Sequence, residues 1–261
     1  MIRKKYIDTS EGQCHIRFVE GEGLPIVFLH QVPSSSRMFE AIMNQLGNEH
    51  SMYAIDTPGF GASFDPVNTP TMKEYCDWLL QIFEALSLEK LHLFGHHTGS
   101  CMAVEIANEY PSLISSITMI GPFAATVEEK EVMRASMGAD WSPVDDGSHL
   151  MMAWNLVGDI LGARGHLELH HRETLDTLRA YHSVHQAHES VWEQDFISLF
   201  KQIDCPMLIM CAPDDVLYPF FNVAKELRPD ATYKEISGKN YETDLDSATI
   251  VDTFKTFMQN L

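Results

Sequence analysis

The residues Gly95-His96-His97-Thr98-Gly99 have the spacing of a Gly-x-Ser-x-Gly turn, with histidine at the central position. Such a turn joins a strand to a helix and presents its central side chain, and the flanking glycines let the chain fold that tightly. The group presented here is the imidazole of His97, which can exchange protons near neutral pH. We therefore expect His97 to be the catalytic group.

A serine triad built on this kind of turn also needs a histidine late in the chain. The last of the 13 histidines is His188, in a chain of 261 residues, so we do not expect an ordinary serine hydrolase. A neutral His97 could activate water or remove a substrate proton, which typically contributes about 10²–10⁴ to a rate. We favour this general-base role over direct attack by the imidazole, because an acyl-imidazole is labile and no second base is evident.

The elements that position this turn alternate between short apolar runs and helical patterns, which predicts a mostly parallel sheet covered on both faces. Eight strands are expected, at 5–8, 14–20, 25–30, 51–56, 90–95, 116–121, 206–212 and 231–237. Helices are expected at 73–86, 98–109, 219–227 and 247–261. The predicted fold class is therefore α/β.

The stretch from 123 to 204 breaks this alternation, because it reads as several helices without a convincing strand. We expect it to be a helical lid inserted into a core formed by 1–122 and 205–261, lying over the strand ends where open sheets bind ligands. Four methionines are expected to wall its pocket with adaptable side chains: Met133, Met137, Met151 and Met152.

Charge and composition limit the partners. The 18 basic and 37 acidic residues give a net charge of -19, which would repel nucleic acids and anionic membrane surfaces. Five scattered cysteines lack metal-ligand spacing, and no apolar run approaches the length of a membrane span. We expect a cytoplasmic protein with reduced cysteines and no cofactor, whose partners are a small molecule and, in a homodimer, a second copy of the chain.

Four motifs in order along the chain resemble the α/β-hydrolase superfamily over nearly the whole length. They are His30-Gln31-Val32-Pro33, Asp56-Thr57-Pro58-Gly59-Phe60-Gly61-Ala62-Ser63, the turn around His97, and Asp214-Asp215-Val216-Leu217-Tyr218-Pro219. This resemblance implies an eight-stranded α/β-hydrolase fold with an inserted helical cap. It also implies that Asp215 is the acid of the site, and that the backbone N–H groups of Val32 and Thr98 form an oxyanion hole.

The chain departs from that family at three positions. Histidine replaces serine at 97, Gln31 stands where the family usually has glycine, and Asn240 stands where the family has its late histidine. We expect His97 to lie within hydrogen-bonding reach of Asp215 or Asn240. The pocket around them is expected to include His30, Gln31, His96, Trp154 and Tyr241.

The sequence predicts a cofactor-free enzyme that acts on a small, partly apolar carbonyl compound, by ester or lactone hydrolysis or by C–C cleavage or elimination. Two alternatives stay open. The chain could be a ligand-binding or regulatory protein that keeps the pocket without the chemistry. It could also be a hydrolase whose working histidine comes from the lid, with His149, His182 and His185 as candidates. The spacing of His182, His185 and His188 is better explained by a solvated helix face than by a metal site, because no carboxylate or cysteine pattern joins them.

Overall fold

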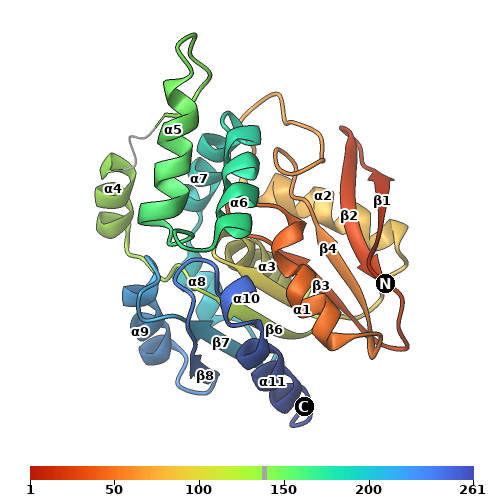
Figure 1. Ribbon diagram of the computed structural model, residues 1–261. Helices are drawn as coiled ribbons and strands as arrows, with labels where there is room; N and C mark the ends of the chain where they lie inside the picture. The colour runs from red at the N-terminus through yellow and green to blue at the C-terminus, as the bar shows by residue number, and fades with distance from the viewer. Residues whose placement is uncertain (137–139) are drawn as a thin grey trace.

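The computed structural model describes residues 1–136 and 140–261, and its centre is an eight-stranded sheet with the order β1-β2-β4-β3-β5-β6-β7-β8 (Figure 1). All eight expected strands are present: β1 (Arg3–Asp8), β2 (Gln13–Val19), β3 (Gly23–Leu29), β4 (His50–Ile55), β5 (Leu91–His96), β6 (Ile114–Ile120), β7 (Met207–Cys211) and β8 (Thr232–Glu235). The pairs β1–β2 and β2–β4 are antiparallel, whereas the remaining neighbours are parallel.

Parallel pairing brings the carboxyl ends of the central strands to one edge of the sheet. Leu29 of β3 is paired with Gly95 of β5, and His96 of β5 is paired with Ile120 of β6. The loops that follow β3, β5, β6 and β7 therefore leave the sheet side by side, which is where ligands bind in open α/β sheets.

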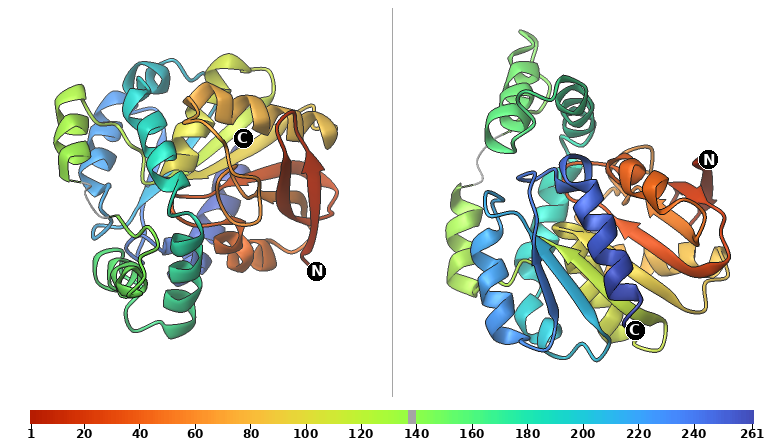
Figure 2. Two further views of the ribbon diagram at one scale, coloured as in Figure 1. Left: turned by 90° about the horizontal axis from the view of Figure 1, so that it is seen from above. Right: turned by 60° about the horizontal axis from the view of Figure 1, so that its bottom comes forward.

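Helices cover both faces of the sheet. One face packs against α2 (Met72–Ala85), α3 (Thr98–Glu109), α8 (Phe196–Lys201) and α9 (Tyr218–Leu227), and the other packs against α1 (Glu40–Leu46) and α11 (Ser247–Met258). Figure 2 shows α11 lying along its face of the sheet. A short 3-10 helix, η1 (Ser36–Phe39), precedes α1, and α10 (Glu242–Leu245) precedes α11.

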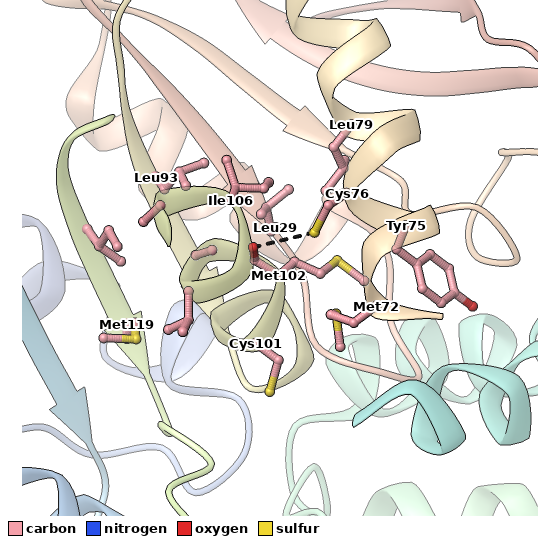
Figure 3. Packing of buried hydrophobic residues seen from close by; sticks show 14 of the residues in the cluster. Leu29, Met72, Tyr75, Cys76, Leu79, Leu93, Cys101, Met102, Ile106 and Met119 are labelled. Carbon is pink, nitrogen blue, oxygen red and sulfur yellow. Dashed lines mark hydrogen bonds between the residues drawn. The ribbon is translucent and has the colours of Figure 1, made fainter. Parts of the chain in front are cut away.

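The core beneath the site is formed where α3 packs between α2 and the sheet (Figure 3). Leu29 and Leu93 from the strands meet Met102 and Ile106 from α3, and all four are almost completely buried. The thiol of Cys76 on α2 donates to the carbonyl oxygen of Met102 at 3.7 Å. Close packing of this kind fixes α3, and with it the turn that precedes α3.

Every element that the structure describes between β6 and β7 is helical. These elements are α4 (Val127–Ser136), α5 (Ser148–Asn155), the π-helix η2 (Leu156–Ile160), α6 (Leu167–Arg179), α7 (Ser183–Glu193) and α8. In Figure 1, α5, α6 and α7 stand together above the sheet, with α5 projecting farthest. None of the helices in the described ranges is both long enough and apolar enough to cross a membrane.

Candidate active site

His97 lies between the end of β5 at His96 and the start of α3 at Thr98, as the glycine-flanked turn predicts. Its φ of 48° is unusual for a residue with a side chain, and its N–H donates to the carbonyl oxygen of Ile120 at 2.9 Å. The turn is tight enough that a Cβ at Gly99 would lie 2.0 Å from the carbonyl oxygen of Leu29. Only glycine fits there, so the local sequence dictates the sharp turn that presents the imidazole.

The imidazole of His97 is paired with Asp215, which follows β7. Nε2 of His97 lies 2.8 Å from Oδ2 of Asp215, and the N–H of Leu217 donates to Oδ1 of Asp215 at 2.6 Å. Burial would raise the pKa of Asp215, but the charge and hydrogen bond of His97, with hydrogen bonds from Glu242 and Leu217, lower it from 3.8 to about 2. Asp215 is therefore ionised and accepts the Nε2 proton of His97, which leaves Nδ1 for a ligand.

Gly121, directly after β6, makes room for this pair. A Cβ at Gly121 would lie 2.3 Å from Cδ2 and 2.5 Å from Nε2 of His97, and the φ of Gly121 is +62°. The ring therefore passes over the backbone of Gly121 to reach Asp215. Sequence reasoning recognised Gly121 only as the end of a strand, because the clash depends on a contact with a ring 24 positions away.

His97 opens into a cavity of about 480 Å³, within the usual size range of small-molecule sites. Its floor carries polar groups from the strand ends: Gln31, His97, Thr98 and Asn240. Most of its walls are apolar side chains from the helical stretch, which include Phe123, Met133, Trp141, Leu156, Ile160, Leu161, Val184, Val191 and Trp192. The cavity therefore combines a small polar floor, which includes His97, with largely apolar walls.

The two backbone N–H groups expected to form an oxyanion hole, those of Val32 and Thr98, belong to residues that line this cavity. Neither N–H donates a hydrogen bond to any residue of the described ranges. Next to them, the Gln31 side chain donates from Nε2 to the carbonyl oxygen of Asn240 at 2.8 Å, and so joins the loop after β3 to the loop before α10. The Asn240 side chain is 1% exposed, and its Oδ1 has no hydrogen-bond partner among the described residues.

Four residues expected in the pocket do not line it. His30 is fully buried, and both of its ring nitrogens face backbone groups. Its Nδ1 lies 2.7 Å from the carbonyl oxygen of Gln31, and its Nε2 accepts from the N–H of Thr57 at 3.0 Å. His96 is also fully buried and does not line the cavity, because its Nε2 lies 2.9 Å from the buried carboxyl group of Glu242.

Trp154 and Tyr241 do not line the cavity either. The ring of Trp154 stacks on His170 with a centroid distance of 3.6 Å, and Tyr241 is buried in a small cluster with Val157 and Leu169. Both aromatic side chains hold the helical stretch in place. They do not contact the cavity, because a motif or composition argument cannot specify which face of a helix or loop turns inward.

Of the three histidines in the helical stretch that were candidates for the pocket, only His185 lines the cavity in the part of the chain that the structure describes. His185 lines the cavity, but His182 lines a separate surface hollow of about 470 Å³, and Nδ1 of His149 accepts from the N–H of Val144. His188 also lines the cavity and was not among the candidates. Burial, with the charge of His185, lowers the pKa of His188 from 6.5 to about 4, so this wall histidine is neutral near pH 7.

Of the three described methionines among the four that were expected to line the pocket, one does so. Met133 lines the cavity, whereas Met151 and Met152 are exposed on α5, and Met137 lies outside the described residues. Cys101 on α3 lines the cavity as well, but burial raises the pKa of its thiol to about 12. Its thiol is therefore protonated near neutral pH and is a poor nucleophile.

A second histidine–carboxyl pair lies directly beside the first. The rings of His96 and His97 stack with a centroid distance of 4.4 Å, and Nε2 of His96 lies 2.9 Å from Oε2 of Glu242. His96 and Glu242 are both fully buried. Glu242 could not be found from the sequence, because it belongs to no motif and reaches His96 across 146 positions.

No group of three or more potential metal-ligating side chains occurs in the ranges that the structure describes. Ser34, Ser35 and Ser100 do not line the cavity: Ser100 donates to the carbonyl oxygen of Gly95, Ser35 donates to Asp176, and Ser34 is fully buried. Ser136 lines the cavity wall, and its hydroxyl donates to the carbonyl oxygen of Met133.

The fold and the sequence are both similar to those of known proteins. A family model for the alpha/beta hydrolase fold matches residues 25–149. The solved structure of an esterase from Exiguobacterium antarcticum superposes with a TM-score of 0.84 over 97% of this chain and 98% of that chain, at 18% identity. The chain has the α/β-hydrolase fold.

Two further proteins are similar to the chain over most of their length. The enol-lactonase of Burkholderia xenovorans LB400 has a TM-score of 0.79 and 17% identity, over 98% of this chain and all of that chain. In sequence, the chain is 21% identical to (E)-2-((N-methylformamido)methylene)succinate hydrolase of Acinetobacter baylyi, over 81% of this chain and 80% of that protein.

Proposed function

We propose that this protein is a hydrolase of a small, largely apolar and uncharged carbonyl compound, with His97 as the general base. The observation that carries the proposal is the 2.8 Å contact between His97 and Asp215 at the floor of the cavity, which leaves Nδ1 of His97 for a ligand. The names of the compared proteins, an esterase, an enol-lactonase and a substituted-succinate hydrolase, support hydrolysis as the reaction class.

In the proposed reaction, Nδ1 of His97 removes a proton from water while the water oxygen attacks the substrate carbonyl carbon. The Nε2–H of His97 stays bonded to Asp215, whose carboxylate balances the positive charge that the ring gains. When the tetrahedral intermediate collapses, the ring returns this proton to the leaving oxygen. The cycle consumes one water, regenerates neutral His97 and uses no cofactor.

The N–H groups of Val32 and Thr98 are proposed to stabilise the oxyanion of that intermediate. Both belong to cavity-lining residues and make no hydrogen bond within the described chain, so they are available when negative charge develops on the carbonyl oxygen. The start of α3 at Thr98 adds its partial positive charge at the same point. An enolate would be stabilised equally well, so cleavage of a β-diketone fits the same site.

The walls favour an uncharged substrate. The single arginine that lines the cavity, Arg134, already contacts Glu189 and lies 3.7 Å from Glu193. A carboxylate substrate would have to compete with these acids for Arg134. We therefore propose that the helical stretch 123–204 acts as a cap on a core formed by 1–122 and 205–261, and selects apolar groups through side chains such as Phe123 and Trp192.

A second candidate is a hydrolase whose base is a histidine of the cap. The observation in its favour is that His185 and His188 on α7 line the same cavity as His97. His188 is neutral near pH 7 and could accept a proton, but it has no carboxylate partner of the kind that Asp215 gives His97. Its place on the wall suits substrate contact better than catalysis.

The test is turnover of a panel of neutral esters, lactones and β-diketones by the wild type, His97→Ala and His188→Gln. We expect His97→Ala to lower kcat/KM by about 10² or more, the size usually attributed to a general base, with folding retained. His188→Gln should alter KM more than kcat. Unchanged turnover in His97→Ala would refute the assignment, and loss confined to His188→Gln would transfer the role of base to the cap.

A serine-directed fluorophosphonate probe gives an independent check. The wild type should remain unlabelled, because position 97 carries an imidazole and Ser34, Ser35 and Ser100 are buried or hydrogen-bonded. The double variant His97→Ser with Asn240→His should become labelled, since it recreates a serine with a nearby histidine. Stoichiometric labelling of the wild type would show that a serine is the nucleophile. Absence of turnover across the whole panel, with ligand binding intact, would instead favour a binding protein.

A further inference from the structure

Glu242 is the most deeply buried acid near His97, and nothing in the proposed chemistry accounts for it. It lies at the start of α10 and is 0% exposed. Its Oε2 lies 2.9 Å from Nε2 of His96, whose ring stacks on His97, and its carboxyl group faces the carboxylate of Asp215. Two facing carboxyl groups can share a hydrogen bond only if one of them keeps a proton, because two carboxylates have no hydrogen to share.

The position of that proton follows from the partners on each side. Asp215 already accepts from the Nε2–H of His97 and from the N–H of Leu217, so its charged form is well supplied with donors. Glu242 is completely buried, and burial together with the facing Asp215 carboxylate raises its pKa well above 4.5, although backbone hydrogen bonds at Glu242 and Ala212 act against this shift. Its Oε1 makes no hydrogen bond to a donor of the described chain.

His96 cannot supply a compensating charge. Its ring stacks on His97 at 4.4 Å, and burial together with the neighbouring His97 lowers the pKa of His96 well below 6.5. A neutral His96 with its hydrogen on Nε2 donates to Oε2 of Glu242, which acts as the carbonyl oxygen of the acid. The remaining oxygen, Oε1, then carries the hydrogen that faces Asp215.

We propose that Glu242 is a positioning residue that keeps its proton and donates it to Asp215, so that the two carboxyl groups together hold one negative charge beside His97. The hydrogen bonds run in one consistent direction: His96 donates to Glu242, Glu242 donates to Asp215, and His97 donates to Asp215 from the other side. The catalytic consequence rests on the proposed function of His97, but the protonation state of Glu242 does not.

The single charge matters for a base at His97. A second carboxylate in the same buried space would favour the imidazolium and keep the ring protonated before substrate is bound. Loss of the Glu242 hydrogen bond would have a related effect, because Asp215 would then hold the Nε2 proton more strongly. The titratable groups that face this network are His96 of β5, Asp215 and Cys211 at the end of β7, and His97, with His30 more distant.

The first test is infrared spectroscopy of the wild-type protein and Glu242→Gln at pH 9, with no substrate. We expect the wild type to show the carbonyl stretch of a protonated carboxylic acid, and Glu242→Gln to lose it. Glu173→Gln is the matched control, because Glu173 is also fully buried but has a pKa of about 7, so it is ionised at pH 9. Absence of the band in the wild type, or its loss in the control alone, would overturn the proposal.

The second test follows the ring of His97 by nuclear magnetic resonance in protein labelled with ¹⁵N-histidine, and again needs no substrate. In Glu242→Gln, whose neutral amide can still donate to Asp215, the midpoint of the ring titration should stay within a few tenths of a pH unit of the wild type. In Glu242→Leu it should rise by about one unit. A fall of one unit or more in Glu242→Gln would mean that a negative charge had been removed, and would show that Glu242 is ionised in the wild type. A failure of His97→Ala to affect turnover would leave both of these results intact.

Discussion

Two histidine–carboxyl pairs lie side by side at the end of β5, and they differ in what surrounds them. The pair of His97 and Asp215 opens into the cavity, whereas the pair of His96 and Glu242 is completely buried. Their donor–acceptor distances are nearly equal, at 2.8 Å and 2.9 Å. Distance alone therefore does not decide whether such a pair is charged.

The difference comes from burial and from the charge that each carboxyl group faces. Burial raises the pKa of Asp215, but the charge and hydrogen bond of His97, with the hydrogen bond from Leu217, outweigh it and lower that pKa to about 2. Glu242 is completely buried and faces the Asp215 carboxylate, and both raise its pKa well above 4.5. In a buried network, the negative charge settles on the carboxyl group that faces the cationic partner, and the neighbouring carboxyl group stays neutral.

Of the variants that should affect one histidine–carboxyl pair and not the other, Gly121→Ala is expected to change activity most. The new methyl group would lie 2.3 Å from Cδ2 of His97 and would push the ring away from Asp215, while the pair of His96 and Glu242 stays in place. A displacement of about 1 Å at a reacting group can cost about 10²-fold in rate, and we expect a loss of that order in kcat on the neutral-ester panel.

Gly147→Ala is the matched control for backbone strain. Gly147 has a similar φ of +73°, but the nearest atom to its added Cβ is Cδ1 of Leu150 at 3.9 Å. Both variants should lose about 1 kcal/mol of stability, because a side chain is placed at positive φ. Equal activity in the two variants would show that the approach of the His97 ring to Gly121 is unimportant.

A smaller effect should appear in stability as a function of pH, with opposite signs for the two carboxyl groups. The folded-state pKa of Asp215 lies below its usual value of 3.8, so its contribution is present above pH 3.8 and is lost as the pH falls towards 2. Relative to Asp215→Asn, the wild type should lose about 2 kcal/mol over that window.

The contribution of Glu242 to stability should fall as the pH rises, because its folded-state pKa is raised. Above pH 4.5 the unfolded chain releases this proton while the folded chain keeps it, so the wild type loses stability relative to Glu242→Gln, by at most about 1.4 kcal/mol per pH unit. Urea unfolding at a series of pH values measures both differences. Slopes of the same sign for the two variants would contradict the assignment of one charged and one neutral carboxyl.

The smallest expected change is in the pH dependence of unfolding when His188, on the cavity wall, is replaced. The pKa of His188 is lowered from 6.5 to about 4, so the stability that its neutral form contributes is present above pH 6.5 and is lost as the pH falls towards 4. Because the side chain is partly exposed, we expect about 1 kcal/mol relative to His188→Gln, again by urea unfolding. His171→Gln, at an exposed histidine of α6, is the matched control for the loss of an imidazole. A flat difference between wild type and His188→Gln would indicate that this wall is open to water.

The sequence predicted the parts of the molecule whose signals are local. Apolar runs located all eight strands, and the glycine-flanked turn predicted the strand-to-helix position of His97. The pairing of His97 with Asp215 could be anticipated, because carboxyl ends of parallel strands meet at one edge. These inferences needed only the chain order and the direction of the strands.

The walls and the buried network could not be predicted, because they depend on which side chains turn inward after packing. Trp154 and Tyr241 were expected in the pocket, yet Trp154 stacks on His170 and Tyr241 packs with Leu169. Glu242 carries no motif, and its effect on Asp215 exists only once α10 is folded against β5 and β7.

The bond from Gln31 to Asn240 has a consequence for how this site can change over evolutionary time. Gln31 holds the loop through the backbone carbonyl oxygen of Asn240, and it makes no demand on the side chain at that position. A substitution at 240 can therefore alter the polar group offered to a ligand while the loop keeps its anchor. Position 240 is a point where new specificity can arise by single replacements, without first rebuilding the turn that carries it.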